Sequence, residues 1–133
     1  MTVSLLFKVG ILALGAQFLG CTRSEVSFSS DVQPIFEKNC VECHDSGGEG
    51  VTASGFSVRD YESVMKGTRL GRVVVPGSGI SSTLYLVVAQ KTAPEIQMPP
   101  HYRQAWAEGR GSPLSDDEIE IIYTWIDQGA QDN

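Results

Sequence analysis

The sequence has little positive charge: ten Lys and Arg residues stand against sixteen Asp and Glu residues, giving a formal net charge of -6. Nucleic acid and anionic lipid surfaces would repel such a chain, so electrostatic binding to either is not expected. The imbalance favours a protein partner with a basic face instead. With 133 residues, 41% of them hydrophobic and 20% charged, the composition suits one small globular domain.

Apolar runs are short as well. The run Val9–Leu19, preceded by Lys8, is too short for a membrane-spanning helix and has the length of a signal-peptide core. It ends in Phe18-Leu19-Gly20-Cys21, which resembles the lipobox of bacterial lipoproteins, although that motif usually has Leu where Phe18 stands. We therefore predict a signal peptide over 1–20, a lipidated Cys21 with a tether over 21–30, and a domain over 31–133. The alternative is a buried N-terminal helix in which Cys21 is incidental.

Cysteine is scarce, with three residues in the chain. In an exported protein, any single disulfide would leave one of the three unpaired. If Cys21 carries lipid, the other two are those of Cys40-Val41-Glu42-Cys43-His44. Two thiols at this spacing, followed at once by an imidazole, permit three interpretations: a redox dithiol, half of a zinc site, or a covalent attachment site for haem.

The surroundings of this motif favour haem. A redox dithiol is expected before a helix in a βαβ unit, but the Gly-rich segment 45–55 predicts an irregular loop. A zinc site needs a fourth ligand, for which only His101 remains once Cys21 is lipidated. Two Cys near the end of one helix can both reach the vinyl groups of a haem, and His44 would then lie under the iron as its proximal ligand. The zinc and dithiol interpretations remain as alternatives.

A second axial ligand could come from Met65, Met98 or His101. Met65 lies on the apolar face of a predicted helix and is expected in the core. Met98 lies in Gln97-Met98-Pro99-Pro100, where the prolines stiffen the loop around a thioether. We therefore predict Met98 as the distal ligand, with His101 as its chief rival. The choice matters because Met ligation raises the reduction potential relative to His.

The rest of the pattern is helical, with long loops between the helices. Val32, Ile35 and Phe36 have helical spacing after Asp31, a plausible N-cap, and Ser115 with Glu118 forms a capping box. Predicted helices begin at 31 and cover 57–67, 81–91 and the segment from 115 to a stop at Gly129, whereas 72–79 is extended and 92–113 is a structured loop. The predicted fold class is all-α.

Together these features resemble the c-type cytochromes, in particular the short cytochrome-c-like domain of planctomycete proteins. The matching stretches are DVQPIFEKNCVECH, GFSVRDYESVMKG, VVVPGSGISSTLY, QMPP and PLSDDEIEIIYTWIDQGA. The resemblance implies a small cytochrome c-like fold in which the N- and C-terminal helices cross around one covalently bound haem c, with Phe36 matching partners at Ile122 and Trp125.

The resemblance also implies individual roles. Cys40 and Cys43 would attach the haem, His44 would be the proximal ligand and Met98 the distal one. A carbonyl in the loop Val75-Pro76-Gly77 would accept the Nδ1 proton of His44. Arg69, Arg72, Arg103 and Arg110 are candidates to pair with haem propionates, although a solvated surface position is favoured for each.

The expected function is electron transfer by a haem protein that is not an enzyme, carried out on the periplasmic side of a bacterial envelope with a redox partner protein. One alternative is a haem-based sensor or peroxidase-like enzyme, although no distal His or Arg pair indicates peroxide chemistry. Another is a docking module for a larger enzyme, in which the haem is mostly structural.

Overall fold

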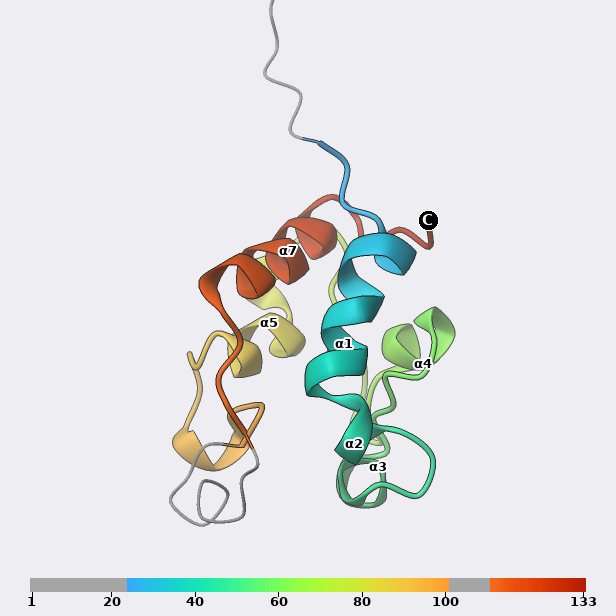
Figure 1. Cartoon of the computed structure of the whole chain (residues 1–133), viewed down its shortest axis with the longest axis vertical. Coiled ribbons are helices and arrows are strands. Elements are labelled where there is room, and N and C mark those ends of the chain that lie inside the picture. The colour runs from blue at the N-terminus through green and yellow to red at the C-terminus, as the bar shows by residue number, and fades with distance from the viewer. Residues whose placement is uncertain (1–23, 101–110) are drawn as a thin grey trace, which may run out of the picture.

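The structure, a computed structural model, describes residues 24–100 and 111–133 (Figure 1). In chain order its elements are η1 (Phe28–Val32), α1 (Gln33–Asn39), α2 (Val41–His44), α3 (Glu49–Ser54), α4 (Tyr61–Lys66), η2 (Gly79–Ser81), α5 (Thr83–Val88), η3 (Pro94–Ile96) and α7 (Asp116–Asp127). These two ranges contain helices and no strand; one isolated bridge joins Thr68 and Gly71. The predicted all-α class is confirmed.

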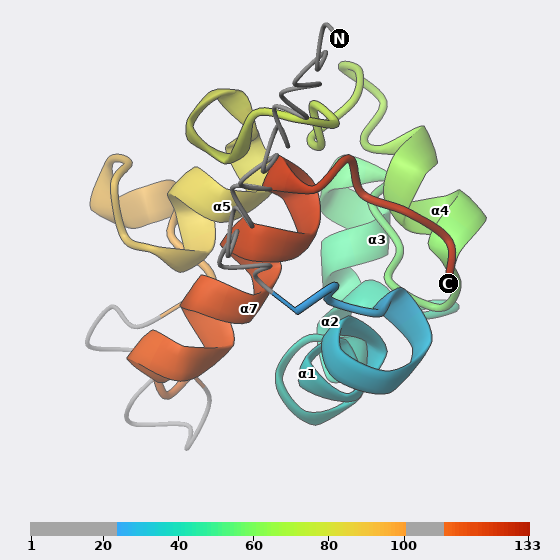
Figure 2. The same cartoon turned by 90° about the horizontal axis from the view of Figure 1, so that it is seen from above.

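The core lies where η1 and α1 meet α7, and Figure 2 shows these elements side by side. Phe28, Val32, Ile35 and Phe36 recur at one helical face and are all buried. On α7 the fully buried side chains are Ile122, Trp125 and Ile126. The two apolar faces cover each other, as the resemblance implied for the N- and C-terminal helices.

Phe28 is the aromatic residue that links the two faces. Its ring centroid lies 5.4 Å from that of Trp125 and 6.3 Å from that of Phe36. Phe36 and Trp125, which the sequence suggested as partners, are both fully buried in this cluster. Their connection through Phe28 was not predicted, because that residue stands in an otherwise polar stretch.

The first helical turn begins earlier than predicted. Ser27, not Asp31, is the N-cap: its hydroxyl accepts a hydrogen bond from Ser30 N at 3.2 Å. Asp31 instead accepts one from Ser27 N at 2.8 Å. Burial of Phe28 explains the difference, because its ring reaches the core only if the helical turn extends back to it.

The predicted tether also differs from the structure over the residues described. Residues 24–29 are fastened to the segment 128–133, for example through hydrogen bonds from Val26 N to Gln128 Oε1 at 2.8 Å and from Phe28 N to Asn133 Oδ1 at 2.8 Å. The packed domain therefore begins before residue 31. The predicted signal peptide and Cys21 lie outside the described residues.

The segment 45–55, predicted as an irregular loop, contains the helix α3. Gly55 ends this helix with a φ of 80°, a left-handed conformation suited to glycine. Arg69 satisfies two of its last carbonyls, with Nη2 at 2.8 Å from Thr52 O and 2.7 Å from Ala53 O. This prediction was wrong because the partner of the helix end lies far along the chain. Arg69 thus serves as a cap for α3.

The helices predicted over 57–67 and 81–91 form but are shorter, as α4 and α5, whereas the predicted capping box is present at the start of α7. The side chain of Asp60 accepts from Ser63 N at the start of α4, and Ser115 and Glu118 make both bonds of the capping box of α7. Residues 72–78 are non-helical, as expected, and Gly79 begins η2. Within the described ranges, the helices are all too short or too polar to cross a bilayer.

Candidate functional site

Four predicted site residues line one cavity of about 520 Å³: Cys40, Cys43 and His44 from the α1–α2 region, and Met98 after η3. Figure 1 shows α2 and η3 on opposite sides of the lower half of the molecule. The volume falls within the roughly 300–1,000 Å³ of typical ligand sites. Cys40 and Met98, which are 58 positions apart in sequence, thus line the same cavity, as the predicted ligand set requires.

The imidazole of His44 is oriented by a backbone carbonyl. Its Nδ1 lies 3.0 Å from Phe56 O, and the Phe56 ring packs edge-on against it at 5.4 Å between centroids. With Nδ1 as the donor, Nε2 carries the lone pair and is the nitrogen available to a metal.

The carbonyl expected in Val75-Pro76-Gly77 is not the one that the structure uses. In that loop Gly77 N donates to Ile126 O at 2.8 Å, which places the loop at the end of α7. The segment beside His44 is 56–58 instead, since Val58 N also donates to His44 O at 2.9 Å. The prediction was wrong because a backbone acceptor leaves no signature in the sequence.

The helix α3 forms a second wall against His44. A Cβ atom on Gly50 would lie 2.6 Å from His44 Cε1 and 2.8 Å from Nε2, so the ring occupies space that only glycine leaves open. Ser54 connects α3 to the segment 56–58 on the other side of the ring. Its hydroxyl donates to Gly50 O at 2.7 Å and accepts from Phe56 N at 3.0 Å. Sequence reasoning missed Gly50, Ser54 and Phe56, since the helix that assembles them was not predicted.

Cys40 and Cys43 are not joined by a disulfide, and the Cys40 thiol is unsuited to dithiol redox chemistry. Burial, followed by the nearby charges of Glu118 and Cys43, raises the pKa of Cys40 to about 12. Reactive dithiols require a lowered pKa, so that a thiolate is present near neutral pH. As for zinc, no three His, Cys, Asp or Glu side chains in 24–100 and 111–133 gather as metal ligands, and His101 lies outside these ranges.

The loop that carries Met98 is fixed to α5. Met98 N donates to Val87 O at 3.1 Å, and the buried side chain of Gln97 donates through Nε2 to Gln90 O at 3.0 Å and Thr92 O at 2.9 Å. The thioether is therefore presented by a backbone held on both sides. Met65 packs against the hydrophobic core, as predicted.

This donor set fits a covalent haem. It offers two thiols at the attachment spacing that are not joined by a disulfide, an imidazole whose Nε2 can ligate a metal, and a thioether lining the same cavity. Gly50 provides the room that the oriented imidazole needs.

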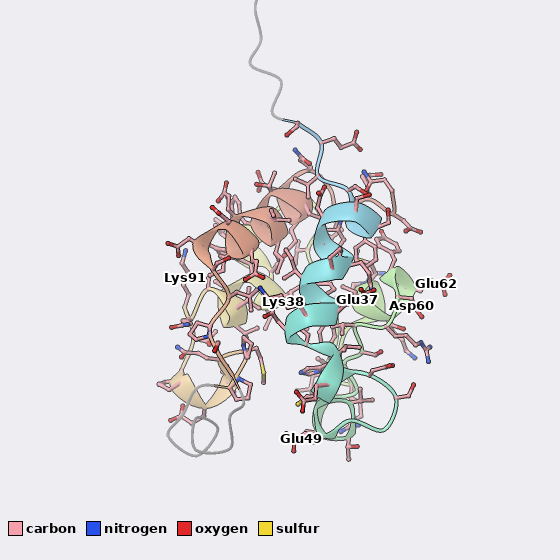
Figure 3. The ribbon with its side chains drawn as sticks, in the orientation of Figure 1. Glu37, Lys38, Glu49, Asp60, Glu62 and Lys91 are labelled. Carbon is pink, nitrogen blue, oxygen red and sulfur yellow. The ribbon has the colours of Figure 1, made fainter. Side chains whose placement is uncertain are left out.

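An ion pair between Lys38 and Glu118 lies at the edge of the cavity. Figure 3 shows Lys38 on the side of α1 toward α7. Lys38 Nζ lies 2.9 Å from Glu118 Oε1, and Asn39 Nδ2 donates to the same oxygen at 3.3 Å. The hydrogen bond from Lys38, followed by that from Ser115 N, lowers the pKa of Glu118 from 4.5 to about 2. The pair joins the end of α1 to the start of α7.

Glu118→Gln is expected to lower the free energy of unfolding at pH 7 by about 1 kcal/mol, since Gln can keep the cap but not the charge. Because the pKa is lowered in the folded state, the contribution of the carboxylate is complete above about 4.5 and is lost as the pH falls toward 2. Urea unfolding at pH 7 and pH 3.5 should show a smaller difference from the native chain at the lower pH. Asp117→Asn, on the same exposed turn, is the matched control; an equal difference at both pH values would contradict the assignment.

The comparisons with known proteins agree with this site. Residues 40–101 match the model of the family described as planctomycete cytochrome C. This part of the chain is thus similar to the planctomycete cytochrome C family, in agreement with the resemblance seen in the sequence. Such a domain implies covalently bound haem c.

Particular relatives are larger proteins. The alpha subunit of hydrazine synthase from Kuenenia stuttgartiensis is 33% identical over 129 residues, which cover 80% of this chain and 15% of that protein. The solved structure of Kuenenia stuttgartiensis hydrazine synthase matches with a TM-score of 0.51 and 27% identity, over 79% of this chain and 16% of that one. The cytochrome c-like fold is thereby confirmed. The chain spans about a sixth of the length of these relatives.

Proposed function

We propose that the chain is a single-haem c-type cytochrome that carries electrons outside the cytoplasm, with His44 and Met98 as the axial ligands. The observation that carries this proposal is the single cavity lined by Cys40, Cys43, His44 and Met98, with His44 Nδ1 bonded to Phe56 O. When bound, haem supplies a one-electron couple between Fe(III) and Fe(II).

The protein's own contribution is to hold the ligands in fixed positions. The Phe56 carbonyl fixes the tautomer and the plane of the His44 ring, and Gly50 and Ser54 keep the ring against that carbonyl. The hydrogen bond from Met98 N to Val87 O holds the Met98 loop on α5, and those of Gln97 hold it on the segment that follows α5. Ligands held in this way change position little between the oxidised and reduced states. The reorganisation energy of the iron site is therefore small, which suits electron transfer.

Replacement of the predicted distal ligand tests this proposal. Met98→Ala should abolish the weak long-wavelength absorption band of a Met–Fe(III) pair, lower the reduction potential and allow the reduced protein to bind carbon monoxide. Met65→Ala, a change of the same residue type in the core, should leave all three properties intact while costing about 2–5 kcal/mol of stability. A Met98→Ala protein with an unchanged band would assign the sixth position to another residue.

We further propose that the redox partner presents a basic face to this cavity. Glu42, Glu49 and Glu95 line it, whereas Lys38 is the cationic residue among its described lining and is paired with Glu118. Opposite charges on two proteins accelerate their association. Added salt weakens this attraction, because charges farther apart than the Debye length, about 8–10 Å near physiological ionic strength, are largely screened.

The rate of electron transfer to a basic partner protein should therefore fall steeply with added salt, and Glu95→Gln should lower both the rate and its salt dependence. Glu62→Gln, the same charge change on the α4 flank that Figure 3 shows, is the control. Stopped-flow measurement over a range of ionic strength gives both quantities. Rates independent of salt, with both variants equal to the native chain, would refute the docking interpretation.

The proposed location is the periplasmic side of a bacterial membrane, with Cys21 lipidated. The apolar run Val9–Leu19 followed by Gly20-Cys21 supports this proposal. Lipoprotein processing supplies more than one acyl chain, enough for stable anchoring.

The size of the relatives favours a second candidate. Because the chain matches about a sixth of the hydrazine synthase chains, it could instead act as a haem-stabilised docking module for a larger enzyme. The two functions differ in redox behaviour: a carrier is reduced and reoxidised at the potentials of its partners, and a docking module stays in one oxidation state while the assembly turns over. Absorption spectra recorded during turnover distinguish them.

A further inference from the structure

The N-terminal segment of the described chain is fastened to the body of the domain through Gln128. Ser24 O accepts a hydrogen bond from Gln128 Nε2 at 3.0 Å, and Val26 N donates to Gln128 Oε1 at 2.8 Å. Both groups of one amide are thus used to hold a backbone that is more than a hundred residues away in sequence.

Asn133 holds the same segment a second time. Its Oδ1 accepts from Phe28 N at 2.8 Å, its backbone oxygen accepts from Ser29 N at 3.0 Å and from Ser27 Oγ at 2.8 Å, and its Nδ2 donates to Glu25 Oε1 at 2.9 Å. With Phe28 buried beneath these contacts, residues 24–29 form a clasp on the segment 128–133. They are part of the packed domain.

The clasp leaves little chain between the domain and the proposed anchor. From Cys21 to Ser24 there are three residues, which span at most about 11 Å when fully extended. A free tether over residues 22–30 would instead reach about 30 Å, enough for the domain to turn over at the membrane surface. A lipid on Cys21 would therefore hold the clasped end of the domain close to the bilayer.

The residues that line the cavity come mostly from elements at the other end of the molecule. In Figure 1 the N-terminal segment leaves beside the end of α7, and α2, α3 and η3 lie at the opposite end of the long axis. Figure 3 places Glu49, a lining residue of the cavity, at that far end. A molecule held by its clasped end would thus present the cavity to the aqueous phase.

We propose that the clasp of residues 24–29 orients the anchored domain with its haem cavity away from the membrane, so that its partner is a water-soluble protein with a basic face. This inference rests on the proposed lipidation of Cys21 and on the proposed haem site. It excludes direct exchange with a donor dissolved in the bilayer. The carboxylates of Glu42, Glu49 and Glu95 supply the complementary charge on the exposed side.

The test uses the lipidated holoprotein in vesicles that contain a headgroup-labelled fluorescent lipid, with quenching of the label by haem as the measure of distance. The variant carries about twenty Gly and Ser residues inserted between Arg23 and Ser24, with a mean reach of about 25 Å. The matched control carries the same insert after Asn133. Quenching should be weak in the native chain, severalfold stronger in the Arg23–Ser24 insertion, and weak in the control.

Reduction by a quinol dissolved in the same vesicles provides the second measurement. It should be slow for the native chain and the control, and faster for the Arg23–Ser24 insertion. Strong quenching in the native chain, or no change on insertion, would overturn the orientation while leaving the cytochrome assignment intact. Vesicle flotation and the haem absorption spectrum are recorded first, because a failure of either overturns the proposed anchor or haem site and shows which one is wrong.

Discussion

Replacement of both Cys40 and Cys43 with Ser is expected to abolish covalent haem attachment completely. Both thiols line the cavity that His44 and Met98 share, so the variant keeps the pocket but loses the atoms that would form the thioether bonds. The oxygen of Ser does not substitute for sulfur in that chemistry. The mass of the denatured protein and its absorption after extraction of free haem give the result directly.

Cys21→Ser is the matched control for this experiment, since it changes the third Cys of the chain and leaves the site untouched. It should keep the covalent haem and lose the acyl groups, and the protein should be released from the membrane. The single variants Cys40→Ser and Cys43→Ser each retain one possible thioether bond and should retain part of the haem. A double variant that still carries the mass of haem after denaturation would overturn the site assignment.

Gly50→Ala is expected to disrupt the axial ligation of His44 with little change to the remainder of the fold. The new methyl group would lie 2.6 Å from His44 Cε1 and 2.9 Å from the backbone oxygen of Cys43, whereas ordinary contacts begin near 3.4 Å, so the ring and the backbone beside it have to shift. The movement stretches the 3.0 Å hydrogen bond from Nδ1 to Phe56 O and displaces Nε2 from its ligating position. We expect a lowered haem content or a changed spin state, with an overpacking cost of about 1–3 kcal/mol.

Gly47→Ala separates this steric effect from a general loss of stability. A Cβ atom at Gly47 would meet nothing within 4 Å, but its φ of 81° makes the substitution cost about 1–2 kcal/mol. Both variants should therefore unfold more easily in urea, and only Gly50→Ala should change the absorption and electron paramagnetic resonance spectra. Identical spectra for Gly50→Ala and the native holoprotein would mean that α3 does not confine the ring.

The sequence predicted those parts of the fold whose residues carry their own signals. The capping box at Ser115 and the glycine after α4 act through contacts only a few residues long, so their pattern alone is sufficient. The attachment motif is likewise local, since its spacing is set by the haem that it binds. Met98 was predicted because two prolines stiffen the loop just after its thioether, and the structure places it at the cavity, where its role as a ligand stays a prediction.

The parts that were missed depend on contacts over long distances or on the backbone. The helix α3 forms with a cap from Arg69, and Phe28 reaches the core only because α7 offers Trp125 to its ring. The carbonyl of Phe56 carries no side-chain signature, so it could not be distinguished from the carbonyls of Val75-Pro76-Gly77. Composition alone made residues 24–29 resemble a polar tether, although Gln128 and Asn133 bind them.

The choice of Phe56 as the partner of His44 has a consequence for how the protein matures. The imidazole and the carbonyl that orients it are only twelve positions apart, and Gly50 and Ser54 lie between them. The whole proximal half of the pocket is therefore encoded in one continuous stretch, from Cys40 to Val58. Contacts of such short sequence separation form early, before distant segments dock. A nascent chain could thus present a ready receptor for the porphyrin while Met98, on the opposite wall, has still to arrive.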